Sequence, residues 1–129
     1  MSNRILACIA VTIASQAQAQ ALIAGQAREF PSSAVVIADA AIRDKFEGKT
    51  YRVDLADGSS WRLDYKSTGY YFVNTSTGFS DSGKWRIKDG QICTQPRKGP
   101  DSCNDVRDAG DATIFVRRMN GDVIQLKPQ

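Results

Sequence analysis

Short segments in which apolar and polar residues alternate recur about every ten residues, and they constrain the fold more than any other feature. In residues 50–55, Tyr51, Val53 and Leu55 alternate with polar residues, as expected for a strand with one buried face. Aspartate–glycine and asparagine–glycine pairs, which suit hairpin turns, separate several segments. The segments are residues 50–55, 60–65, 70–75, 83–88, 91–95, 104–107, 113–118 and 123–126.

This spacing predicts a mainly β (α+β) fold, an antiparallel meander of about eight short strands that forms a curled sheet or small barrel. The second face of most strands carries charge, so one face of the sheet should meet water. Because the inward side chains are large, we expect a filled interior rather than the cavity of a small-molecule carrier. The predicted core consists of Tyr51, Val53, Leu55, Trp61, Leu63, Tyr65, Trp85, Ile87, Ile92, Ile114, Val116, Val123 and Leu126.

The pattern of residues 33–47 predicts one N-terminal amphipathic helix ahead of the strands. Ser32 or Ser33 can cap its first turn, and Gly48 can take the left-handed conformation that ends a helix. An apolar stripe at three- and four-residue spacing would pack this helix onto the sheet. The stripe consists of Val35, Ala38, Ile42 and Phe46.

Residues 1–21 have the pattern of a cleaved secretory signal peptide. Arg4 precedes an apolar run over residues 5–14, and small residues permit cleavage near 19/20 or 21/22. Cys8 lies inside the apolar run rather than after it, which disfavours a lipoprotein signal. The run is shorter than the roughly 20 residues that span a bilayer, and no later stretch would anchor the mature chain. We therefore expect a periplasmic or secreted protein.

The mature chain is expected to begin with a flexible lead over residues 22–32, followed by a single domain over 33–129. Only Cys93 and Cys103 remain after cleavage, and an even pair in an exported domain predicts a disulfide. The wide spacing of these two cysteines disfavours a redox-active dithiol.

The sequence contains no histidine. Serine and cysteine nucleophiles therefore lack their usual base, and zinc and haem iron lack their commonest ligand. We expect no cofactor, no metal and no enzymatic activity, with a carboxylate-dependent enzyme as a less favoured alternative. The net charge is only +3 and the charges are interspersed, which disfavours nucleic-acid binding.

Several motifs resemble a group of small exported alphaproteobacterial proteins that contain the domain of unknown function numbered 995. They are Gly48-Lys49-Thr50, Gly83-Lys84-Trp85, Asp89-Gly90-Gln91-Ile92-Cys93 and the downstream Cys103. The chain departs from that pattern where it has Thr94-Gln95-Pro96-Arg97 and Asn104 in place of bulky or aromatic residues. The resemblance covers roughly residues 33–126 and implies a secreted β-rich module with one disulfide. It implies no particular activity.

We therefore interpret the chain as a periplasmic binding module for an envelope glycan or lipid, or for another periplasmic protein. The alternative is an inhibitor of a hydrolase that acts through the loop at residues 94–102. Two successive cations, Arg117 and Arg118, break the alternation, so one of them should face inward or mark a strand end. The candidate ligand-binding residues are Tyr71, Arg62, Arg86, Lys88, Arg97 and Lys98.

Overall fold

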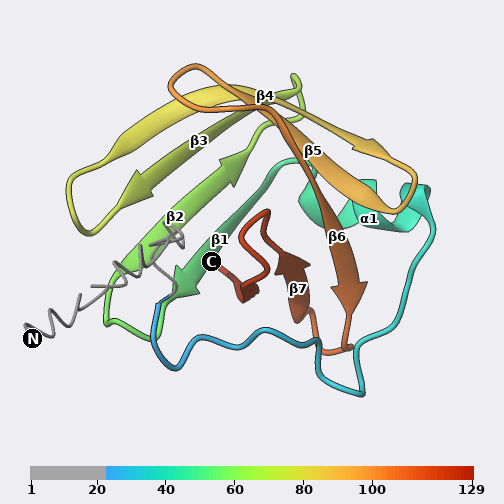
Figure 1. Cartoon of the computed structure of the whole chain (residues 1–129). Helices are drawn as coiled ribbons and strands as arrows, with labels where there is room; N and C mark the ends of the chain where they lie inside the picture. The colour runs from blue at the N-terminus through green and yellow to red at the C-terminus, as the bar shows by residue number, and fades with distance from the viewer. Residues whose placement is uncertain (1–22) are drawn as a thin grey trace, which may run out of the picture.

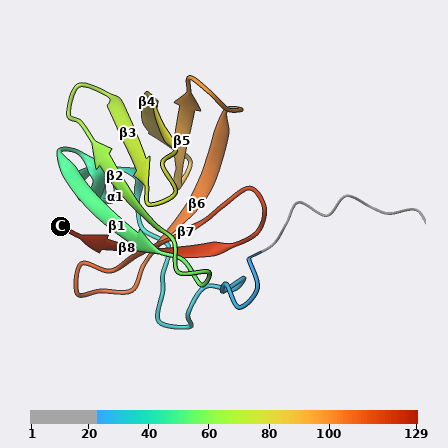
Figure 2. The same ribbon diagram turned by 90° about the vertical axis from the view of Figure 1, so that its left-hand side faces the viewer.

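A computed structural model describes residues 23–129, so the predicted signal peptide lies outside the described residues. This part of the chain forms a closed antiparallel barrel with a short helix, α1 (Asp39–Phe46), at one end (Figures 1 and 2). The strands are β1 (Lys49–Asp54), β2 (Ser60–Tyr65), β3 (Tyr70–Thr75), β4 (Ser80–Lys88), β5 (Gln91–Pro96), β6 (Ser102–Asp108), β7 (Ile114–Arg117) and β8 (Val123–Pro128).

Each strand pairs with the next one along the chain, and β1 pairs with β8 to close the barrel. The closing seam is short, because only Tyr51 and Arg52 of β1 pair with Lys127 and Pro128 of β8. The predicted meander and small barrel with one helix are therefore confirmed. Within residues 23–129, no helix is long and apolar enough to cross a membrane.

The predicted core is also confirmed in its main part, since most of the predicted residues are buried. Trp61 and Trp85 are only partly buried but pack against the core. Tyr71, Val106 and Ile124 are further buried residues that the alternation did not single out as core.

Helix α1 begins later than predicted, because residues 33–38 are not helical. Val35 forms an isolated antiparallel bridge with Asp108 at the end of β6 instead. Residues 35–37 are all β-branched, a residue type with a higher preference for extended backbone than for helix. The prediction of a serine cap was wrong as well, since Ala38 precedes the first turn without a side-chain cap. At the other end Gly48 has a φ of 72°, as expected.

Ile42 and Phe46 are buried and anchor α1 on the barrel. The ring of Phe46 contacts Tyr51 and Tyr65, with ring centroids 5.7 and 4.9 Å apart. Asp39 ties the helix to the β4–β5 hairpin, because its carboxylate accepts the backbone N–H groups of Asp89 and Gly90. The helix and these aromatic side chains therefore fill one end of the barrel.

The segment ahead of α1 packs along the outside of the barrel (Figure 1). The amide of Val123 donates to the carbonyl of Ala27, and Val35 pairs with Asp108. Between these points, the ring of Phe30 lies against the guanidinium groups of Arg107 and Arg117. These contacts give residues 23–35 hydrogen-bonding and apolar partners that a composition rich in alanine and glutamine did not suggest.

Candidate functional site: a cavity in the barrel

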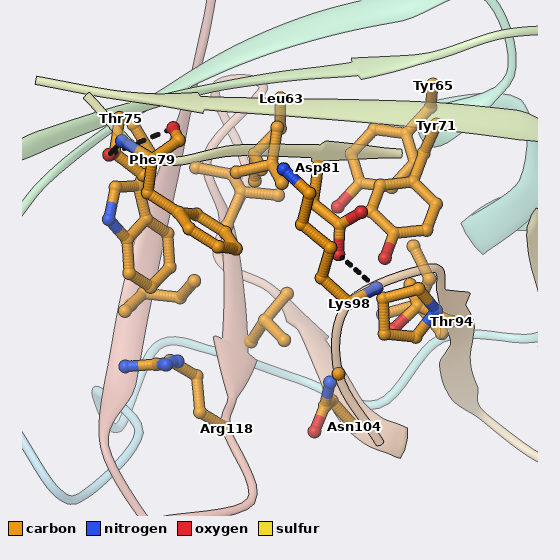
Figure 3. Close-up of a pocket in the computed structure, with 18 residues that line it drawn as sticks. Leu63, Tyr65, Tyr71, Thr75, Phe79, Asp81, Thr94, Lys98, Asn104 and Arg118 are labelled. Atoms are coloured by element: carbon orange, nitrogen blue, oxygen red, sulfur yellow. Dashed lines mark hydrogen bonds between the residues drawn. The ribbon is translucent and has the colours of Figure 1, made fainter. Parts of the chain in front are cut away.

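The barrel contains a cavity of about 320 Å³ at the end away from α1 (Figure 3). Its walls are mainly apolar, with side chains such as Leu63 and Ile124 from β2 and β8. The polar side chains that line it are Thr75, Asp81, Thr94, Lys98, Asn104 and Arg118. This cavity has the mixed lining of a small-molecule site, in which a few polar groups are set in an apolar surface.

The expectation of a filled interior was therefore wrong. The large inward side chains gather at the α1 end, where Tyr65 also contacts Trp85, with their ring centroids 5.7 Å apart. At the other end β3 and β5 direct smaller side chains, those of Val73, Thr75 and Thr94, toward the interior. The space that these short side chains leave is not filled from the opposite wall.

Turns at the mouth of the cavity are held by hydrogen bonds between side chains and backbone. The hydroxyl of Thr75 accepts from the amide of Phe79 at 3.0 Å, which holds the β3–β4 turn (Figure 3). The Asp81 carboxylate accepts the backbone amide of Lys98 at 3.1 Å, and the Lys98 Nζ donates to the Ser80 carbonyl at 2.7 Å. The β5–β6 loop is thereby tied to the start of β4 and lines the mouth.

Arg118 follows directly after β7 and lines the cavity. Its guanidinium lies over the ring of Trp61, 4.6 Å from the centroid. Arg117 faces the outside, where it approaches Glu29 and the ring of Phe30. The prediction that one of these two cations faces inward or marks a strand end is confirmed on both counts.

Two tyrosines line the inner part of the cavity, with their rings stacked 6.3 Å apart between centroids. Burial raises the pKa of the Tyr65 hydroxyl far above its ordinary value. Burial also raises the pKa of Tyr71, with a smaller contribution from the charge of Asp81. Both groups therefore remain protonated near neutral pH and can donate a hydrogen bond.

The Tyr65 hydroxyl faces the cavity (Figure 3). No hydrogen-bond partner for it is found within residues 23–129, and no side-chain polar atom of those residues is both buried and unsatisfied. This hydroxyl therefore borders the cavity as a hydrogen-bond donor that no described residue engages.

The structure separates the predicted ligand-binding residues. Tyr71 and Lys98 line the cavity, whereas Arg62, Arg86 and Lys88 are exposed on the outer face of the barrel. Tyr71 therefore shares no surface with these three cations, because alternate strand positions point to opposite faces of the barrel wall. Arg97 also lies outside, beside a surface depression that Phe72 lines as well.

Some cations on the outer face of the barrel are neutralised by neighbouring carboxylates. Arg62 pairs with Asp64 at 3.4 Å, and Arg52 pairs with Asp54 at 2.8 Å. Tyr70 and Phe72 are exposed on the outer side of β3. These contacts are those of a mixed, solvated surface.

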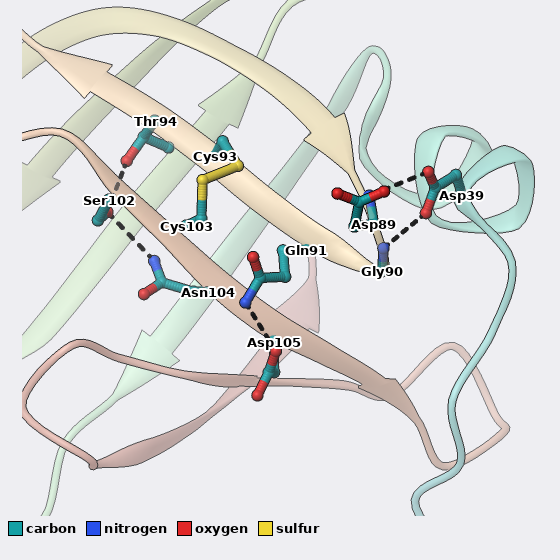
Figure 4. Close-up of a disulfide and its surroundings, with 10 residues drawn as sticks. All are labelled: Asp39, Asp89, Gly90, Gln91, Cys93, Thr94, Ser102, Cys103, Asn104 and Asp105. Atoms are coloured by element: carbon teal, nitrogen blue, oxygen red, sulfur yellow. Dashed lines mark hydrogen bonds between the residues drawn. A yellow bond between two sulfur atoms is a disulfide. The ribbon is translucent and has the colours of Figure 1, made fainter.

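The disulfide between Cys93 and Cys103 is confirmed (Figure 4). The two cysteines lie directly opposite each other on β5 and β6. Their neighbours Ile92 and Thr94 line the cavity, so the disulfide lies on the outer side of the sheet.

The aspartates near Cys103 do not converge on one point. Asp105 accepts from the Gln91 amide at 2.9 Å, and Asp108 pairs with Lys45 at 3.1 Å, while Asp101 and Asp111 are exposed. Within the part of the chain that the structure describes, no three acidic, cysteine or histidine residues are grouped to hold a metal ion.

Sequence reasoning missed Trp61, Thr94, Asn104 and the cavity role of Arg118. The alternation places Trp61 in the core, and the only local signal for Arg118 is the broken alternation at residues 117–118. Comparison with known proteins adds no further assignment, because no family model, curated protein or solved structure matches the chain.

Proposed function

We propose that the protein is an exported, non-enzymatic binding module that holds one small, largely apolar molecule inside its barrel. The observation that supports this proposal is the 320 Å³ cavity with apolar walls and accessible polar groups. An eight-stranded barrel is just wide enough either to be filled by its own side chains or to hold one small ligand. A cavity of this size favours the second arrangement.

The volume limits the size of the ligand. It lies at the lower end of the range for ligand pockets, roughly 300–1,000 Å³. If each non-hydrogen atom needs about the 30 Å³ that a water molecule occupies in the liquid, the enclosed part of a ligand has about ten such atoms. A chain of eight carbon atoms with a small polar head fits this limit.

The predicted signal peptide would place such a module in the periplasm or outside the cell. Its ligand would then be a component of the envelope or a small molecule of the medium. A protein partner bound through the stapled loop at residues 94–102 remains the alternative. The attachment of Lys98 to β4 favours the cavity, because it holds this loop over the mouth instead of leaving it to protrude.

The test is a titration of the mature protein with 1-octanol, followed by NMR through the indole N–H signal of Trp61. We expect saturable binding with shifts confined to the cavity residues. Val73→Phe, which places a ring in the cavity, should weaken the binding at least about tenfold, the equivalent of 1.4 kcal/mol. Asn74→Phe is the matched control, because Asn74 is the exposed neighbour on the same strand.

The control should bind 1-octanol as the unchanged protein does. Absence of saturable binding, or equal affinity in the Val73→Phe variant, would refute the proposal. Thermal unfolding of all three proteins checks that the variants are folded.

A further inference from the structure

Arg118 is held in the cavity wall by its own turn and by Trp61. Its amide donates to the carbonyl of Asp122 at 2.7 Å, and its carbonyl accepts from the amide of Gly121 at 2.9 Å. The guanidinium lies over the Trp61 ring, an arrangement that orients a cation without consuming its hydrogen-bond donors. Backbone and side chain of Arg118 are therefore both held by contacts within the protein.

The donors of this guanidinium have no protein acceptor in the described chain. Within residues 23–129 its side chain forms no hydrogen bond and no ion pair, although Arg117 beside it pairs with Glu29. The carboxylate whose charge acts on Arg118 is that of Asp122. Asp122 is already bound by Arg28 at 3.1 Å and by Asn120 at 3.0 Å.

The other two charged side chains that line the cavity, Lys98 and Asp81, are opposite in sign but form no ion pair with each other within residues 23–129. Lys98 and Asp81 lie together at the mouth, where the Asp81 carboxylate accepts the backbone amides of Ser82 and Lys98. The Lys98 ammonium is engaged by the Ser80 carbonyl and lies over the ring of Phe79. The formal charges of the cavity lining therefore sum to +1, and Arg118 forms no ion pair within the described residues.

Partial burial makes this charge costly. Desolvation lowers the pKa of Arg118, although the group stays protonated because arginine titrates far above neutral pH. An oxyanion that accepts two N–H groups of the guanidinium would remove this cost and form a charge-assisted pair. A net lining charge of +1 matches a monoanion better than a phosphate, which carries nearly two charges at neutral pH.

We propose that the cavity binds a small amphipathic monocarboxylate, with its carboxylate on Arg118 and its apolar chain among the aliphatic and aromatic walls. This inference rests on the proposed function, since it names the ligand class for the same cavity. Leu63, Val116 and Ile124 line the cavity together with Arg118, so one molecule can contact both kinds of surface.

The experiment compares three probes that share an eight-carbon chain and differ in the head group: octanoate, 1-octanol and octylammonium. Affinities for the mature protein at pH 7 are measured by NMR titration. A hydrogen bond to a charged group contributes about 1.5–3 kcal/mol. We therefore expect octanoate to bind about tenfold or more tightly than 1-octanol, and octylammonium to bind more weakly than both.

Arg118→Gln should abolish the preference for octanoate while leaving 1-octanol binding in place. Arg117→Gln is the matched control, because it removes the same charge one residue away on the outer face, and it should keep the preference. Arg118→Lys, which keeps the positive charge, should retain part of it. This variant serves as a second test if Arg118→Gln does not fold.

The outcomes separate this inference from the proposed function. If 1-octanol and octanoate bind wild-type protein equally, or if Arg118→Gln keeps the preference for octanoate, the ligand class is wrong and the cavity site stands. If none of the three probes binds the wild-type protein, the cavity is not a binding site and both proposals fail.

Discussion

Tyr65 lies at the boundary between the filled end of the barrel and the cavity. Its ring contacts Phe46, Tyr71 and Trp85, with centroid distances from 4.9 to 6.3 Å. Aromatic pairs of this kind contribute about 0.5–1.5 kcal/mol each beyond the burial of their area. One residue thus connects the helix, the aromatic end of the barrel and the wall of the cavity.

We expect the buried tyrosines to make the fold sensitive to alkali. Burial raises the pKa of Tyr51 to about 12 and that of Tyr65 further, while both titrate near 10 in the unfolded chain. Above pH 10 the unfolded state therefore binds fewer protons than the folded state, and the free energy of unfolding falls as pH rises. Below pH 10 this stabilisation is fully present.

Urea unfolding between pH 9 and 11 measures this effect. Tyr65→Phe should flatten the dependence, whereas Tyr70→Phe, at an exposed position, should not. If the free energy of unfolding depends on pH equally in wild-type protein and Tyr65→Phe, the buried Tyr65 hydroxyl is not the cause of the sensitivity to alkali.

Among the elements, the hairpin of β5 and β6 carries the disulfide on its outer face and side chains that line the cavity on its inner face. The disulfide joins the outer faces of the two strands, and Thr94 and Asn104 line the cavity from the inner face. Gln91 and Asp105 form a second outer pair on the same ladder through a hydrogen bond of 2.9 Å. The outer face of this hairpin therefore contributes to the stability of the fold, and its inner face carries the proposed ligand contacts.

Removal of the disulfide should lower stability without changing the cavity. Cys93→Ser/Cys103→Ser should reduce the free energy of unfolding by about 3 kcal/mol in the chain-entropy description of a short loop. Its affinity for 1-octanol should be unchanged. Gln91→Ser/Asp105→Ser is the matched control for loss of an outer cross-strand pair, with an expected cost of at most about 1 kcal/mol.

Urea unfolding and the 1-octanol titration provide both measurements. The prediction is wrong if the double cysteine variant is as stable as wild-type protein. It is also wrong if the folded variant no longer binds 1-octanol.

For the molecule as a whole, the segment before α1 links the two ends of the barrel. It starts beside the β7–β8 turn and ends at the bridge between Val35 and Asp108. Its principal polar contact is the pair between Arg28 and Asp122, the latter only 1% exposed. A buried carboxylate that loses its cation must be compensated or protonated, so this contact is expected to matter for stability.

We therefore expect Arg28→Ala to lower the free energy of unfolding by about 1–2 kcal/mol. This cost is low for the loss of a buried carboxylate's partner, because Arg28 itself is half exposed and Asn120 still binds Asp122. Arg52→Ala, which breaks an exposed ion pair with Asp54, should cost clearly less, because solvent screens that pair. Urea unfolding compares the two variants. Equal costs would show that the segment does not stabilise the barrel through Asp122.

Much of this architecture could be predicted from local patterns. The alternation located the strands and most of the core, because successive side chains of a strand always point to opposite faces. The pairing of Cys93 with Cys103 followed from their number in an exported domain. Apolar spacing alone placed the helix start too early, because it does not register that Val35 gains two backbone hydrogen bonds from Asp108 in the folded state.

The sequence by itself determined which residues can share a face of a strand, since that property has a period of two and needs no partner. The tertiary structure decided which residues of different strands lie at the same level of the barrel, because the stagger between strands is set only when the barrel closes. That stagger collects Phe46, Tyr51 and Tyr65 at one end and leaves a cavity beside Thr94 at the other. It also brings Arg118 over Trp61, two residues that are far apart in the sequence, and so creates the charged wall on which the proposed ligand class depends.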